Sequence, residues 1–190
     1  MFSCLIAFIL LTIYYYFKYK EVKMDYKQLT ICYFFTFFLL FLFVKVEGFP
    51  SLTEFYRLKK QTGHWYHGNS NLIPFTAGLS ITDLFNLVAF VPIGIMLPLM
   101  WEKYHRLLPT VAYGAALSLL IEFSQLFTFH RVTNTSDLLM NILGTIVGWL
   151  FFKKTLKPLF SKNKACEMTG EEGYEEWLLP SIAIISALFA

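Results

Sequence analysis

Apolar residues along the chain form six runs, and short polar segments separate them. The runs cover residues 2–17, 29–46, 84–101, 107–129, 138–152 and 177–190. A helix needs about 20 residues to cross a bilayer, with a range of about 17 to 25. Four runs reach that length with their flanking residues, whereas the first is short and the last holds Pro180 near its start. The pattern predicts an all-α integral membrane protein, a bundle of five to six transmembrane helices.

Composition agrees with this fold class. Of the 190 residues, 56% are hydrophobic, 19% are aromatic and only 15% are charged, which is far from the balance of a soluble domain. Basic residues follow the first run where a signal-peptide cleavage site would stand, so we expect an uncleaved helix there. The chain, 1–190, is predicted to be a single multi-pass domain in the cell membrane.

Lysine and arginine are concentrated in alternate loops. The segments that follow the first, third and fifth runs hold eleven of the 16 basic residues. Because cytoplasmic loops collect these residues, the amino terminus is predicted to lie outside. The segment 47–82 is then an outer loop, and its first half alternates charged and apolar residues as a surface-lying amphipathic helix would. The segment 161–176 is predicted to be a flexible cytoplasmic linker.

The candidate site consists of polar residues at helical spacing within or beside the apolar runs. They are Asn86, Glu122, Gln125, Arg131, Asp137 and Asn141. Ionisable groups at membrane depth are costly and commonly functional. The fourth helix is expected to run outward to Phe129, which puts Glu122 about 10 Å below its outer end. All six residues are therefore expected to share the outer leaflet and to bind a ligand there.

Gly144 and Gly148 form a G-x-x-x-G pattern on the same predicted helical face as Asp137 and Asn141. Such a pair lets a neighbouring helix approach closely, and the resulting contacts stabilise a helix bundle in lipid. We expect one of the two preceding helices to pack there.

These residues, in this order and spacing, resemble the VanZ-like family. The resemblance covers about 71–152, the predicted VanZ-like core. Its pieces are the loop segment Asn71-Leu72-Ile73-Pro74-Phe75, then Asn86, Phe90, Pro92, Gly94, Glu122, Gln125, Arg131, Asp137, Asn141, Gly144 and Gly148. The loop residues Asn71, Pro74 and Phe75 are expected to fold over the mouth of the site as a lid. The chain departs from the family at Asn134, where an acidic residue is common; if that carboxylate serves a charge-dependent step, this chain is a binder with altered preference.

The resemblance implies a small polytopic protein of the cytoplasmic membrane of Gram-positive bacteria, linked to reduced susceptibility to teicoplanin. Teicoplanin is a glycopeptide antibiotic that carries a lipid tail. No defined reaction is attached to the family motif, so the resemblance implies membership and assigns no catalytic residue.

The chemistry of the candidate site suits an amphiphile. A guanidinium such as that of Arg131 binds phosphate with two hydrogen bonds, while the chain of the amphiphile stays in lipid. The expected partners are membrane lipids or a lipid-linked envelope component, with a lipoglycopeptide as the alternative. No nucleic-acid partner, cofactor or metal is expected, because the basic loops follow from topology and His64 and His67 lack a further ligand nearby.

Three other interpretations of the polar residues remain open at this stage. They could be structural, with Asp137 as a helix cap or a partner of Arg131 and the amides as interhelical hydrogen bonds. A membrane-embedded enzyme could use Glu122 and Asp137 as acid and base on a lipid-linked phosphate, with Arg131 as a clamp, although the sequence offers no nucleophile. A proton-coupled transporter could use Glu122 as its proton carrier, although no inverted repeat is detected.

Overall fold

The computed structural model describes residues 2–21, 26–46, 50–66, 70–71, 73–75, 78–128, 133–160 and 175–189. Helices form nearly all of the regular structure in these residues, which confirms the predicted helical class. In chain order the elements are α1 (Phe2–Glu21), α2 (Tyr26–Phe41), η1 (Leu42–Val46), α3 (Leu52–Thr62), β1 (Ser70–Asn71), α4 (Ile81–Met100), η2 (Glu102–His105), α5 (Leu107–Gln125), β2 (Thr133–Asn134), α6 (Thr135–Phe151), η3 (Phe152–Leu156), α7 (Lys157–Phe160) and α8 (Glu175–Ala187).

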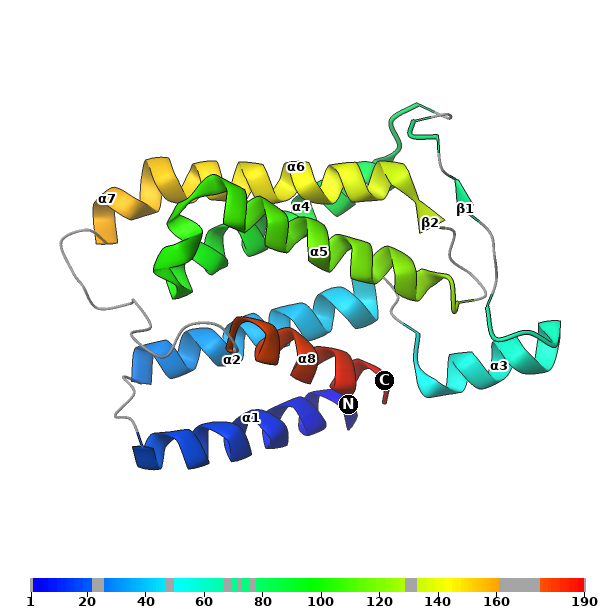
Figure 1. The fold of residues 1–190 in the computed structure, drawn as a ribbon, viewed down its shortest axis with the longest axis horizontal. Helices are drawn as coiled ribbons and strands as arrows, with labels where there is room; N and C mark the ends of the chain where they lie inside the picture. The colour runs from blue at the N-terminus through cyan, green and yellow to red at the C-terminus, as the bar shows by residue number, and fades with distance from the viewer. Residues whose placement is uncertain are drawn as a thin grey trace.

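The apolar helices run side by side between two ends of the molecule (Figure 1). The strands β1 and β2, the helix α3 and both chain ends lie at one end, whereas η2 and α7 lie at the other. Helices α4, α5 and α6 pack together, and helices α1, α2 and α8 form a second group joined to the first through α2 and α4. The ring of Phe35 on α2 meets that of Trp101, just after α4, edge to face with 6.4 Å between centroids. Aromatic packing therefore helps to join the two groups.

Three of the described helices are long and apolar enough to cross a membrane: Ile81–Met100, Leu107–Gln125 and Thr135–Leu156. Three shorter apolar helices accompany them, at Ser3–Phe17, Leu29–Val44 and Trp177–Ala187. The last of these measures only about 17 Å at 1.5 Å per residue, less than the hydrocarbon thickness of a bilayer. The structure thus supports three spans by length and composition, and the bundle of five to six spans stays a prediction.

Glycines let α4 and α6 approach until their backbones touch. A Cβ atom on Gly144 would collide with the carbonyl oxygen of Leu87, and one on Gly148 with that of Val91. On the facing helix, a Cβ atom on Gly94 would collide with the carbonyl oxygen of Thr145. The G-x-x-x-G pair of α6 therefore packs on α4. Four residues separate Gly144 from Gly148 on α6, and four separate their contacts Leu87 and Val91 on α4. The residue numbers rise together along the two helices, so the helices are parallel.

The helix α5 ends earlier than the sequence indicated. We expected it to continue to Phe129, but it ends at Gln125 and is followed by turns. The hydroxyl of Ser124 donates to the carbonyl of Ile121 at 2.7 Å, and that of Thr128 donates to the carbonyl of Gln125 at 2.8 Å. These hydroxyls and the turn N–H groups supply partners for carbonyls that a longer helix would have bonded. The apolar run therefore extends beyond the helix.

The segment that we expected to form an amphipathic helix does form one. Helix α3 buries Leu58 completely and leaves most of its other residues exposed or half-buried. It ends at Gly63, whose φ of 75° is left-handed and suits glycine. The N–H of Leu52 donates to the carbonyl of Leu188 at 2.9 Å, so α3 is attached to the end of α8. Its expected position on the membrane surface stays a prediction.

Alanine at Gly144 or Gly148 is expected to destabilise the protein by about 1 to 3 kcal/mol, because the added methyl group must push α4 and α6 apart. Thermal unfolding of the purified protein in detergent measures this effect as a lower midpoint. The control is Leu143→Ala, beside the first glycine but 46% exposed, which should change the midpoint little. Wild-type unfolding of both glycine variants would contradict the backbone contact.

Candidate functional site at the β1–β2 end

The beginnings of α4 and α6 and the end of α5 meet at the end of the molecule where β1 and β2 pair (Figure 1). This region, with its buried polar residues, is called the polar end below. Five of the six predicted site residues lie within the described chain, and four of them are buried: Asn86, Glu122, Gln125 and Asn141. Asp137 is half-buried, and Arg131 lies outside the described residues.

Glu122 connects the end of α5 to β2. Its side chain is only 5% exposed, and its Oε2 accepts a hydrogen bond of 2.9 Å from the backbone N–H of Asn134. We expected Glu122 to lie about two turns below the end of this helix. Because α5 ends at Gln125, Glu122 lies in the last helical turn instead. A buried backbone N–H needs a hydrogen-bond partner, and the Glu122 side chain supplies one. The buried carboxylate therefore positions the backbone that leads into α6.

The loop that carries Asn71, Pro74 and Phe75 is attached to β2 and to the start of α6. Strand β1 pairs in parallel with β2, with Asn71 opposite Asn134. Farther along the loop, the N–H of Phe75 donates to the Oγ of Ser136 at 2.8 Å. Phe75 has a φ of 56°, which is unusual for a residue other than glycine, while Pro74 is exposed. The loop is thus held against the start of α6 at two points, and its role as a lid stays a prediction.

Asn134 also begins the helix α6. Its Oδ1 accepts a hydrogen bond of 3.1 Å from the N–H of Ser136, which makes Asn134 the N-cap. Asp137 follows in the first turn, where a negative charge is favoured by the helix dipole. Asparagine and aspartate are equally good N-caps, so an acidic residue at this position would make the same bond. The departure from the family pattern therefore leaves the start of α6 intact.

Asn141 joins α6 to α5 inside the bundle. Its Nδ2 donates to the Oγ of Ser118 at 2.9 Å, and both residues are completely buried. Its backbone carbonyl accepts from the hydroxyl of Thr145 at 3.0 Å. Its Oδ1 has no hydrogen-bond partner among the described residues. Asn141 is therefore an interhelical contact that keeps one acceptor available, and buried acceptors normally have a partner.

Helix α4 begins with a capping box, and the sequence has the residue spacing that this motif requires. The N–H of Ser80 donates to the Oδ2 of Asp83 at 2.7 Å, and the N–H of Asp83 donates to the Oγ of Ser80 at 3.2 Å. A serine followed three residues later by an acidic residue, before an apolar run, is the sequence signal for this motif. Asp83 is buried beside the site, with only 2% of its surface exposed. The capping box nevertheless gives it a structural role.

Two residues that the sequence did not single out also hold the bundle together: Ser136 at the polar end and Thr145 farther along α6. Ser136 accepts the hydrogen bond from the loop, and nothing in its spacing distinguishes it from other serines. Thr145 packs its side chain where a Cβ atom of Gly114 would stand, while its carbonyl faces Gly94. It thus contacts both α4 and α5 from α6. A threonine among apolar residues is a weak signal, because its hydroxyl can bond the preceding turn.

The chemistry available at the polar end is that of hydrogen bonding and charge. The polar end holds buried carboxyl, amide and hydroxyl side chains from α4, α5 and α6, and no group of three potential metal ligands occurs among the described residues. Such a set can recognise the polar head of a molecule whose apolar part remains in lipid.

Replacing Glu122 by alanine is expected to lower the free energy of unfolding by about 1 to 3 kcal/mol, because the N–H of Asn134 loses a buried acceptor. Glu122→Gln keeps a carbonyl oxygen that can accept this bond and should lose less. Thermal unfolding of both variants in detergent gives the comparison. Equal losses in the two variants would show that this hydrogen bond is not what the side chain contributes.

At the N-cap, Asn134→Asp is expected to unfold at nearly the wild-type temperature, whereas Asn134→Ala should lose about 1 kcal/mol with the capping bond. The helical signal of purified protein, followed on heating, measures both variants. A large loss in the aspartate variant alone would mean that a second carboxylate near Glu122 is not tolerated.

Comparison with known proteins identifies the family. The VanZ/LLP1 family model matches residues 4–160, a range that contains the predicted core 71–152. Protein VanZ of Enterococcus faecium is 32% identical over 100 residues, which cover 52% of this chain and 62% of that protein. The alignment therefore spans less than two thirds of this relative, and no solved structure matches. With a family model matched across most of its length, the chain is a membrane protein that belongs to the VanZ/LLP1 family.

Proposed function

We propose that this protein acts at the cell envelope and contributes to reduced teicoplanin susceptibility by binding or excluding an amphiphile at its polar end. Family membership and the similarity to Protein VanZ support an association with teicoplanin resistance. The observation that carries the binding role is the gathering of buried polar side chains from α4, α5 and α6 at one end of an otherwise apolar bundle.

Apolar side chains next to the polar end offer a path for a lipid chain. On α4, Leu84, Phe85 and Val88 are 55%, 64% and 62% exposed, and on α5 Leu119 and Phe123 are 56% and 60% exposed. In a membrane these faces contact acyl chains. An amphiphile can therefore keep its tail along α4 or α5 while its head reaches the buried polar groups.

The distribution of charge supports an outward-facing polar end. Among the described residues, the opposite end carries five exposed basic side chains, Lys103, Arg106, Lys153, Lys154 and Lys157, whereas α3, at the end where β1 and β2 lie, carries three, Arg57, Lys59 and Lys60. Basic residues favour the cytoplasmic side, so the polar end and the amino terminus face outward in this proposal. A lipid-linked envelope component and a lipoglycopeptide are both accessible from that side.

Arg131 supplies the cation in this proposal. It precedes β2 by two residues in the sequence. A guanidinium can bind a phosphate or carboxylate with two hydrogen bonds, and it is always charged. Hydrogen-bond donors of the same ligand would bind two further groups. These are the Oδ1 of Asn141, which has no partner among the described residues, and the half-buried carboxylate of Asp137.

Antibiotic susceptibility in a sensitive Gram-positive host tests the proposal. The wild-type protein is expected to raise the inhibitory concentration of teicoplanin but not that of vancomycin, which serves as the glycopeptide without a lipid tail. Arg131→Ala, Asp137→Asn and Glu122→Gln should lose most of this rise. Glu54→Gln changes a carboxylate on α3, at the same end of the molecule but not among the predicted site residues; it is the matched control and should retain the rise.

Membrane abundance of every variant is measured on the same samples, so that loss of protein is not mistaken for loss of function. The proposal is wrong if the rise survives all three substitutions at equal abundance. It is also wrong if the two antibiotics respond alike, because the lipid tail would then have no part in recognition.

A further inference from the structure

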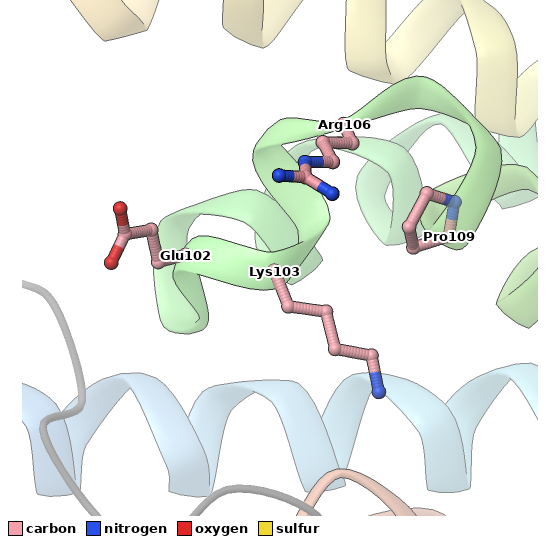
Figure 2. A pocket seen from close by; sticks show the side chains of 4 residues that line it. All are labelled: Glu102, Lys103, Arg106 and Pro109. Atoms are coloured by element: carbon pink, nitrogen blue, oxygen red, sulfur yellow. The ribbon is translucent and has the colours of Figure 1, made fainter.

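A pocket of about 370 Å³ lies at the turn between α4 and α5, at the end of the molecule opposite the polar end. Glu102, Lys103, Arg106 and Pro109 line it (Figure 2). None of these residues belongs to the polar end, so the pocket is a separate feature. Its volume is within the usual range for sites that hold small ligands.

The lining of the pocket holds two cations, one carboxylate and one proline, so its net charge is positive. Figure 2 shows the carboxylate of Glu102 pointing away from both Lys103 and Arg106, so it does not lie between the two cations. Both cationic side chains are exposed, and they extend to different sides of the turn. Their length and flexibility allow the two charged groups to reach one headgroup from either side.

The beginning of α5 adds to the positive character of the pocket. Arg106 is the N-cap of this 19-residue helix, and its side chain makes no capping hydrogen bond. The first N–H groups of a helix lack partners within the helix and carry the positive end of its dipole. Pro109 has no N–H. The available N–H donors are therefore those that precede it in the first turn of α5, next to the two cations. Together these groups favour a phosphate.

The pocket lies at the turn between two helices that are long and apolar enough to cross a membrane, which puts it at the level of lipid headgroups. The indole N–H of Trp149 donates to the carbonyl of Tyr104 at 3.2 Å, within η2. The Nζ of Lys103 lies 5.2 Å from the centre of the Tyr104 ring, and that of Lys153 lies 4.9 Å from the Trp149 ring. Tyr104 and Trp149 are both buried, so these contacts hold η2, which carries Lys103, against α6.

An apolar surface borders the cationic pocket. Leu107 and Leu108, the first two residues of α5, are 40% and 79% exposed. A soluble anion would gain nothing from these side chains, whereas the acyl chains of a lipid would cover them. The pocket thus presents cations and helix donors to a phosphate and leucines to a hydrocarbon chain.

We propose that the pocket at Lys103 and Arg106 binds the phosphate of an anionic phospholipid whose acyl chains lie beside Leu107 and Leu108. Basic pockets between membrane helices are suited to such headgroups. The bound lipid contacts both η2 and the start of α5. This role is independent of the proposed function at the polar end.

Thermal unfolding of the full-length protein in detergent tests the proposal, with phosphatidylglycerol, phosphatidylcholine of the same acyl chains, or inorganic phosphate added. Phosphatidylglycerol is expected to raise the midpoint more than either of the others. Lys103→Gln and Arg106→Gln should each weaken the apparent affinity for it by about tenfold, as expected for losing one charge-assisted contact. Lys154→Gln, at the same end but outside the pocket, is the control and should respond as the wild type does.

Each variant is compared with its own midpoint in phosphatidylcholine, so a general loss of stability does not imitate a loss of binding. An equal rise with inorganic phosphate alone would replace the lipid by a soluble anion and overturn the proposal. An equal loss in Lys154→Gln would show diffuse attraction to the basic end. An equal rise with phosphatidylcholine would show that the headgroup charge is not recognised.

Discussion

The close approach of α4 and α6 is the constraint on which the other contacts depend. Lipid tails are as apolar as leucine side chains, so helices in a membrane gain little from burying apolar surface and rely on close packing and hydrogen bonds. Gly94, Gly144 and Gly148 remove the side chains that would keep these two backbones apart. Because the helices are parallel, their amino-terminal ends are brought to the same end of the molecule, and α5, which packs mainly on α6, also ends there.

Many of the polar side chains at that end hold loops and helix ends in place. Glu122 holds the backbone of β2, Asn134 caps α6, and Ser136 holds the loop that carries Phe75. The structural and functional interpretations of the polar residues are therefore not exclusive. A site that binds a ligand needs its groups held in place, and here the residues that hold the frame lie directly beside those assigned to binding.

The helical class and the contact face of α6 could be predicted, because they follow from apolar run length and from the spacing of small residues. The end of α5 could not be read from hydropathy: the run stays apolar to Phe129, while the hydroxyls of Ser124 and Thr128 supply the bonds of a turn. The pairing of β1 with β2 was also beyond prediction. It joins two-residue segments 63 positions apart in the chain, and such short segments have no periodicity to detect.

The hydrogen bond between Glu122 and β2 has a consequence for how the family can diversify. The carboxylate recognises the main chain of position 134, and every amino acid except proline presents the same N–H there. Evolution can therefore exchange the side chain at this position, including its charge, without losing the link between α5 and the start of α6. Side-chain chemistry at the start of α6 can thus change while the hydrogen bond from the main chain to Glu122 stays available.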